Sequence, residues 1–137
     1  MGRNKSVGIG RIGEDMARIR FRQEGWTMFR VQPETRVIMI KGKPVVVPVR
    51  SSSLEEGIAD FMGYVVDIKD PTTVDAILRV CEAKAVRGRT CPPSTFKRQH
   101  DWLMKIPEES RYVYVWWYDY GVGVLARYIG QGFRHYV

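Results

Sequence analysis

Apolar residues in the N-terminal part of the chain recur at the spacing of a helix. Ile12, Met16 and Ile19 are three or four positions apart, which places them on one helical face. Gly25 follows this pattern and suits the residue just after a helix end, where a left-handed conformation is common. The sequence therefore predicts a helix over residues 11–24.

Farther along, short runs rich in β-branched and aromatic residues predict strands. Two runs either side of Lys41-Gly42-Lys43-Pro44 indicate a hairpin, in which Pro48 belongs at a sheet edge. The turn-forming sequence at 69–75 separates two further runs. The expected strands cover residues 26–32, 36–40, 45–50, 58–68, 76–84 and 111–121.

The last of these strands, at 111–121, is apolar without a break rather than in alternation. A continuous apolar strand is buried on both faces, either in the core or in a dimer interface. Before it, Ser94 or Thr95 is expected to cap a helix that runs to about residue 105. Its core-facing residues would be Phe96, Trp102 and Leu103. Residues 122–137 fit a short helix or a strand equally well.

The order of helix, several strands, helix and strand predicts an α/β domain built around one sheet. A chain of 137 residues suits a single domain, 1–137, and residues 1–10 are expected to form a flexible basic arm. No apolar segment approaches the ~20 residues that span a bilayer. Two cysteines and the lack of a secretory signal pattern favour a reducing, cytoplasmic location.

Charge is distributed unevenly in this protein, whose formal net charge is +7. Residues 1–50 carry 11 basic and 4 acidic side chains, residues 51–84 carry 3 and 7, and residues 85–137 carry 8 and 4. Basic flanks favour binding to the phosphates of a nucleic acid. The acidic middle segment would oppose that binding unless cations neutralise part of it, so the pattern favours a divalent metal site.

Glu82 and Lys84 are the candidate chemical groups in this acidic segment. In a strand they point to the same face, because side chains alternate with period two. Asp60 begins the neighbouring strand and could lie beside Glu82 at one end of the sheet. Two close carboxylates repel unless a proton or cation lies between them, and Mg²⁺ is held by one or two carboxylates together with water and phosphate oxygens. A plain surface ion pair between Glu82 and Lys84 is the alternative reading.

Together these segments resemble the PD-(D/E)XK nuclease superfamily, and within it the Holliday-junction resolvases of the archaeal and RecU types. The similar segments are "GRIGEDMARIRFRQEGW", "SSSLEEGIADFMGYV", "CEAKAVRGRTCPPSTFKRQHDWL" and "YVYVWWYD". They cover roughly residues 8–120 as an ordered series of short motifs. Ala59 stands where the superfamily's name has proline, and the hairpin at 36–50 is longer than a minimal resolvase needs.

The resemblance implies a restriction-endonuclease-like core, with a central mixed β-sheet flanked by helices, in a C2 homodimer. It implies that Asp60, Glu82 and the carbonyl of Ala83 bind Mg²⁺, with Mn²⁺ as a substitute. Lys84 would assist the attacking water, Glu14 would support the metal site, and Gln99 would position Lys84 or the phosphate. The substrate would be branched DNA, and such a resolvase would suit the cytoplasm of a prokaryote or of the host of a phage. The residues expected to contact it are Arg3, Lys5, Arg11, Ser52, Ser53, Arg87 and Arg89.

Other interpretations of the same residues stay open. Glu14 would also suit the first turn of a helix through the helix dipole. Gln99 could be an exposed helix residue, and Ser52 and Ser53 ordinary loop residues. The whole chain could be a nuclease for linear duplex or single-stranded DNA, a non-catalytic DNA-binding module, or an RNA-binding protein.

Overall fold

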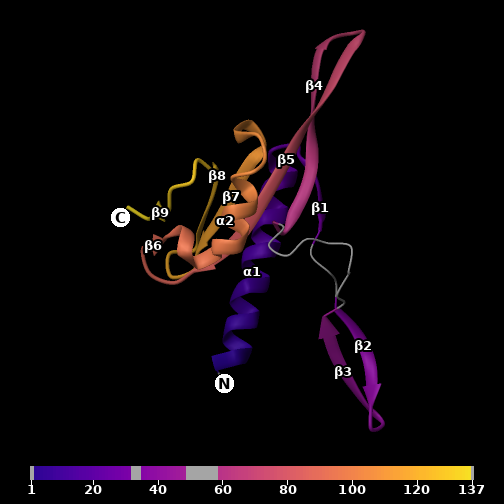
Figure 1. Ribbon diagram of the computed structural model, residues 1–137, viewed down its shortest axis with the longest axis vertical. Coiled ribbons are helices and arrows are strands. Elements are labelled where there is room, and N and C mark those ends of the chain that lie inside the picture. The colour runs from indigo at the N-terminus through magenta and orange to yellow at the C-terminus, as the bar shows by residue number, and fades with distance from the viewer. Residues whose placement is uncertain (1, 32–34, 49–58, 137) are drawn as a thin grey trace.

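The structure, a computed structural model, describes the backbone of residues 2–31, 35–48 and 59–136 and the side chains of residues 9–31, 38–45 and 59–136. Figure 1 shows the elements in chain order. They are α1 (Gly2–Gln23), β1 (Thr27–Arg30), β2 (Thr35–Ile40), β3 (Lys43–Pro48), β4 (Phe61–Asp70), β5 (Thr73–Val86), β6 (Thr90–Cys91), the 3₁₀ turn η1 (Pro93–Phe96), α2 (Lys97–Leu103), the 3₁₀ turn η2 (Glu108–Ser110), β7 (Arg111–Trp117), β8 (Val122–Arg127) and β9 (Phe133–Arg134).

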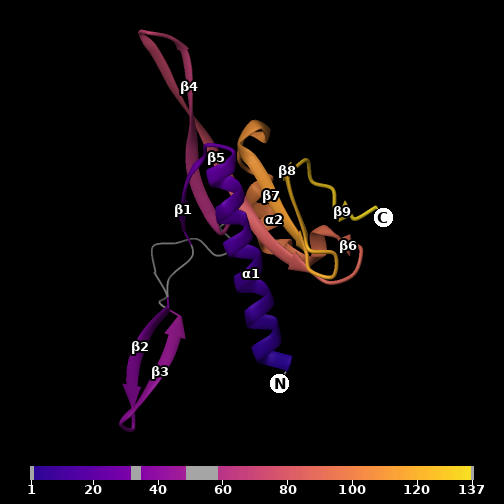
Figure 2. The ribbon, with the colours of Figure 1, turned by 180° about the vertical axis from the view of Figure 1, so that it is seen from behind.

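A five-stranded sheet in the order β1-β4-β5-β7-β8 forms the centre of the protein. Its neighbouring strands are antiparallel, except that β5 and β7 run parallel. The chain therefore has to cross from β5 to β7 over one face, and α2 lies on that crossover (Figure 1). Helix α1 covers the opposite face, as the view from behind shows (Figure 2). The expected α/β fold with a mixed sheet flanked by helices is confirmed.

Alternation along β5 divides the core between these two faces. Cys81 and Ala83 pack with Ala17 and Phe21 of α1. Val80, one residue before Cys81, points the other way and packs in the cluster that includes residues of α2. Such alternation is what a strand covered by a helix on each side requires.

Strand β7 is buried on both of its faces, as its continuous apolar sequence predicts. Val113, Val115 and Trp117 belong to the cluster on the α2 side, whereas Tyr114 belongs to the cluster on the α1 side. Because β7 is hydrogen-bonded to β5 and β8 on its two edges, it is part of the core of one chain. It is therefore not free to form a subunit interface.

Helix α1 begins earlier than its apolar spacing predicts. The expected start at residue 11 was wrong, because the helix already begins at Gly2 and includes residues 2–10 that were expected to form a flexible arm. Its expected end is confirmed. Gly25 has a φ of 74°, and the Trp26 amide donates to the carbonyl of Phe21 at 2.8 Å, which is a glycine-ended helix terminus.

Two hairpins extend from this body (Figure 1). Strands β2 and β3 pair only with each other, through a two-residue turn in which Lys41 and Gly42 have φ values of 51° and 76°. Positive φ at both positions is the type I′ turn that suits a tight hairpin. The other hairpin is the distal part of β4 and β5, which pair as far as Asp70 and Thr73. These strands are longer than predicted, because the turn expected over 69–75 is confined to their tip.

The C-terminal part of the chain resolves the remaining sequence predictions. The ambiguous tail forms a strand, since β8 pairs with β7 along its whole length. Phe96 and Leu103 are buried and Trp102 packs against them, as expected. The capping prediction was wrong, because neither η1 nor α2 has a side-chain cap hydrogen bond. In the described part of the chain, no helix is long and apolar enough to cross a membrane.

Candidate functional site

The register of β4 against β5 brings Asp60 and Glu82 together. Phe61 pairs with Cys81, so Asp60, one residue earlier, lies beside Glu82, one residue later. The Asp60 Oδ2 atom accepts a hydrogen bond of 3.0 Å from the backbone N–H of Ala83. The two carboxylates therefore share one end of the sheet, as a common cation site requires.

Glu82 is an ionisable side chain in the protein core, only 2% exposed. Burial raises its pKa well above the ordinary 4.5, and a hydrogen bond with Asp60 and the negative charge of Asp60 raise it further. Its Oε2 atom has no hydrogen-bond partner among the described residues. A buried carboxylate oxygen without a partner costs free energy, so this position calls for a proton or a cation.

Glu14 reaches the same acids from α1. Gly13 allows the helix to come close to β5, since a Cβ atom placed there would lie 3.1 Å from the Cβ of Ala85. Burial raises the pKa of Glu14, and the charge of Asp60 raises it further. Arg30 of β1 opposes this rise, through an ion pair of 2.6 Å between its Nη1 and the Glu14 Oε2. Three carboxylates from three segments thus influence one another.

Lys84 lies close to these acids without pairing with them. Its positive charge opposes the effect of burial on the pKa of Glu82 and on the pKa of Cys91, so the ammonium group is near both. No carboxylate of the described residues lies within ion-pair distance of it. The reading of Glu82 and Lys84 as a plain surface ion pair is wrong, because Glu82 is buried and the pair is not formed. The ammonium group remains able to donate to a bound group.

The remaining predicted site residues are less closely connected to the acids. Gln99 is half-buried on α2, and its side chain makes no hydrogen bond within the residues that the structure describes. Arg87 pairs with Asp119 at 3.1 Å, and the Arg89 Nε donates to the Tyr120 hydroxyl at 2.9 Å, so the turn after β7 holds both. Arg11 is exposed on α1. The side chains of Arg3 and Lys5, and Ser52 and Ser53 altogether, lie outside the described residues.

A basic cavity next to the acids was not predicted from the sequence. It has a volume of about 450 Å³ and lies between α1 and β1. Three arginines line it, Arg18, Arg22 and Arg30, together with Phe21, Trp26, Met28 and Phe29. Arg30 connects it to the acidic site through the pair with Glu14. The four-residue spacing of Arg18 and Arg22 was the available signal, because it places both on one helical face.

The acids fit a divalent cation of the magnesium type. No group of three or more His, Cys, Asp or Glu side chains within the described ranges is arranged to hold a metal ion by itself. Mg²⁺ does not need such a group, because it takes one or two carboxylates and completes its shell with water and substrate phosphates. Asp60 and Glu82, whose buried Oε2 atom has no hydrogen-bond partner among the described residues, match that chemistry.

Comparisons with known proteins give no relative for this chain. No protein-family model, curated protein or solved structure matches it.

Proposed function

We propose that this protein is a Mg²⁺-dependent endonuclease that hydrolyses phosphodiester bonds of DNA at four-way junctions. The observation that carries the proposal is the convergence of Asp60, Glu82 and Glu14 beside Lys84. The Glu82 carboxylate is buried, and one of its oxygens has no partner among the described residues. Perturbed carboxylates that meet a lysine next to a basic cavity are typical of a catalytic site for a phosphate ester.

In this mechanism Asp60 and Glu82, with the carbonyl of Ala83, would hold the cation. When bound, Mg²⁺ supplies a water of lowered pKa and neutralises charge on the reacting phosphate. The ammonium group of Lys84 donates to the attacking water or to a phosphate oxygen and stabilises negative charge there. Glu14 keeps Arg30 at the edge of the site through their ion pair. Gln99 lies on α2, which covers the face of the sheet to which Lys84 belongs. It is proposed to position the phosphate.

The DNA backbone would approach along the basic residues of α1 and β1. Arg11 is exposed on the helix, and Arg18 and Arg22 continue toward the cavity that Arg30 completes. Guanidinium groups suit phosphate because they donate in a planar, bidentate geometry. Arg87 and Arg89, held by the turn after β7, are proposed as additional backbone contacts. Symmetric cutting of a junction needs two such sites, so the enzyme is proposed to act as a C2 homodimer.

Replacing Arg18 and Arg22 with alanine is expected to weaken DNA binding about tenfold at moderate salt, because two phosphate contacts are lost. The slope of log K against log salt should become shallower by about two. Fluorescence anisotropy with a labelled junction over a salt series, in EDTA, measures both quantities. Arg127→Ala is the control, because this exposed arginine lies on β8 at the far edge of the sheet. An unchanged salt slope in the double variant would contradict the proposed path.

The proposal is tested by comparing the cutting of an immobile four-way junction with that of a linear duplex of matched sequence. The wild-type protein is expected to cut the junction at least ~10-fold faster, in Mg²⁺ and not in EDTA. Asp60→Asn protein, purified identically, reports contaminating nucleases. Equal rates on both substrates would indicate a general nuclease instead. Binding to the junction without any Mg²⁺-dependent cutting would indicate a non-catalytic DNA-binding module.

A further inference from the structure

The cavity between α1 and β1 has the size and the lining of a site for a small organic anion. Its volume of about 450 Å³ lies within the ~300–1,000 Å³ that is usual for pockets that bind small molecules. Such pockets are mostly apolar, with a few polar groups that fix the orientation of the ligand. None of the described residues that line this cavity is acidic. The lining consists of four apolar residues, Phe21, Trp26, Met28 and Phe29, and three arginines, Arg18, Arg22 and Arg30.

Two of the three arginines retain donors for a ligand. Arg22 is exposed and makes no ion pair with any residue that the structure describes. Arg18 has a single, long ion pair of 3.9 Å with the exposed Asp15, and surface pairs of this kind are weak. Arg30 is held more firmly, by the 2.6 Å pair with Glu14. The cavity therefore offers at least two guanidinium groups, which suit phosphate through their planar arrangement of donors.

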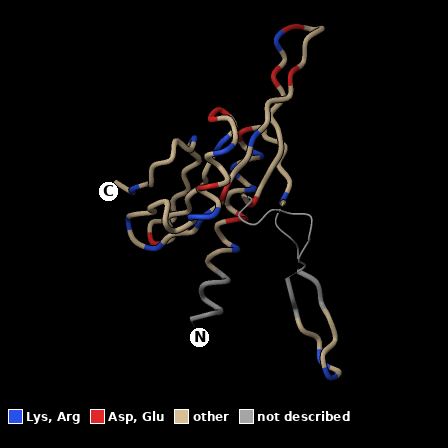
Figure 3. The backbone as a smooth tube through the Cα atoms, viewed as in Figure 1, with Lys and Arg blue, Asp and Glu red and all other residues tan. Residues whose placement is uncertain are grey.

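The charges around the cavity also favour an anion. Residues 9–31 carry five arginines and three acidic side chains. Each of these acids already pairs with an arginine, and the third such pair joins Arg20 and Glu24 at 3.0 Å. The acids of the β4–β5 hairpin gather at its far end (Figure 3). They therefore do not offset the positive charge beside α1 and β1.

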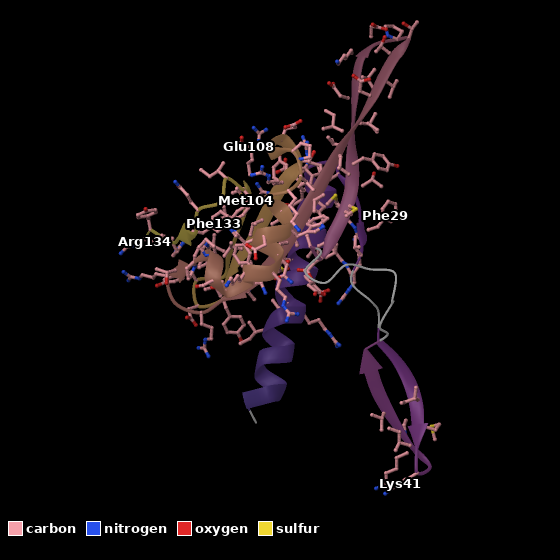
Figure 4. The ribbon with its side chains drawn as sticks, viewed as in Figure 1. Phe29, Lys41, Met104, Glu108, Phe133 and Arg134 are labelled. Carbon is pink, nitrogen blue, oxygen red and sulfur yellow. The ribbon has the colours of Figure 1, made fainter. Side chains whose placement is uncertain are left out.

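The apolar part of the lining lies on the side of the sheet that α1 covers. Trp26 and Met28 are half-buried and pack against the cluster that contains Phe21. The indole of Trp26 is held by packing, since the Phe21 ring is parallel to it at 5.8 Å and Tyr112 meets it edge-on at 4.7 Å. Phe29, labelled on the edge strand β1 in Figure 4, belongs to the other face by alternation. A flat apolar group bound beside the arginines would therefore contact Trp26 and Met28.

Strand β1 connects this cavity to the acidic site. Arg30, which lines the cavity, is paired with Phe61, the residue after Asp60. The backbone N–H of Val31 donates to the carbonyl of Asp60 at 2.8 Å. A DNA strand whose phosphate is held at Asp60 can therefore place a neighbouring nucleotide in the cavity.

We propose that the cavity binds a single unpaired nucleotide, whose phosphate accepts from Arg18 and Arg22 and whose base packs against Trp26 and Met28. A base inside a duplex is stacked and paired, so it reaches such a pocket only at the cost of extrusion. An unpaired nucleotide avoids that cost, and the cavity therefore selects DNA that is locally unpaired. This inference rests on the proposed function for its DNA ligand, but the binding requires neither a cation nor the carboxylates of Asp60 and Glu82.

Fluorescence anisotropy in EDTA, with three labelled duplexes of one sequence, tests the proposal. The first contains a single unpaired nucleotide, the second an abasic residue at the same place, and the third is fully paired. The wild-type protein is expected to bind the first at least ~10-fold more tightly than the second, because the two differ only in the base. Arg22→Ala should weaken the binding of all three duplexes, since each of them carries the phosphates.

Met28→Gln should remove the preference for the unpaired base and leave the affinity for the abasic duplex unchanged. Met16→Gln is the matched control, because Met16 packs against the same apolar cluster but does not line the cavity. Circular dichroism checks the fold of each variant. A preference that persists in Met28→Gln would refute this position for the base.

Calorimetric titration with free dAMP and with deoxyribose 5-phosphate distinguishes the source of the nucleotide. Tighter binding of dAMP without any preference among the duplexes would support a nucleotide site that serves free nucleotides. The proposal is overturned if the wild type binds the unpaired and abasic duplexes equally and dAMP no better than the sugar phosphate. Mg²⁺-dependent cutting of the junction in that case would leave the proposed nuclease function standing. A preference for the unpaired base in a protein that does not cut DNA would have the opposite meaning.

Discussion

Glu82→Gln is expected to abolish the activity and to stabilise the protein. Cutting of the junction should fall at least ~10³-fold, since the variant loses a carboxylate that is proposed to hold the cation. In buffer without divalent cations at pH 8, however, the variant should be more stable than the wild type by about 1–3 kcal/mol. A neutral amide removes the buried negative charge beside Asp60 and can donate a hydrogen bond to it. A substitution that raises stability while it removes activity is typical of a catalytic site.

The pH dependence of this stability difference follows from the direction of the pKa shift. The pKa of Glu82 is raised on folding, above the ordinary 4.5, so the folded state holds the proton more tightly than the unfolded state. The stabilisation that comes from this bound proton is complete below pH 4.5. It is lost as pH rises through the raised pKa of the folded state. Glutamine does not titrate. The variant and the wild type should therefore be similar near pH 4 and diverge as pH increases.

Thermal unfolding from pH 4 to 9, with and without Mg²⁺, measures these effects. Glu108→Gln, which removes an exposed carboxylate, should show no comparable gain. Mg²⁺ should stabilise the wild type by about 2.7 kcal/mol at 100 times its dissociation constant, and Glu82→Gln far less. A variant that is less stable than the wild type at pH 8 without Mg²⁺ would show that the ionised carboxylate is well compensated in the fold. The argument for a cation at that position would then fail.

Much of the site's local arrangement could be predicted from the sequence because it depends on strand geometry. Asp60 and Glu82 lie at the start of one strand and near the end of the next, and antiparallel pairing of consecutive strands brings such positions together. Alternation placed Glu82 and Lys84 on one face. The helix–strand order was also sufficient for an α/β fold around one sheet. The mixed strand directions were expected only from the resemblance, and they result from the helix that lies between two parallel strands of the sheet.

Other features depend on packing that the sequence does not encode locally. Glu82 is buried because elements that are distant in the sequence cover it. From the sequence alone, a glutamate two residues before a lysine was equally compatible with an exposed position. The cavity of Arg18, Arg22 and Arg30 needs α1 and β1 to meet across the turn at Gly25. The first helical turns of α1 lack an apolar repeat, so apolar spacing predicts a helix start that is too late in the chain.

Gly63→Ala is expected to unfold the β1 edge of the sheet and to cost about 3–5 kcal/mol of stability, which lowers Tm by roughly 10 °C. A Cβ atom at position 63 would lie 1.9 Å from the carbonyl oxygen of Thr27 and 2.8 Å from the Cα of Met28. Both are backbone atoms of β1, so no side-chain rotation can relieve the contact. Glycine is thus required here by the close approach of two strands.

The same substitution should also disturb the site, because β1 carries Arg30 and thereby the partner of Glu14. Urea unfolding compares the variant with Gly10→Ala, the matched control on α1. A methyl group at Gly10 would have no neighbour within 4 Å, and alanine favours a helix by about 1 kcal/mol over glycine. Equal stability of Gly63→Ala and the wild type would mean that β1 does not pair with β4 at this register. Loss of stability with unchanged DNA binding would instead show that the edge strand β1 does not contribute to the proposed phosphate path.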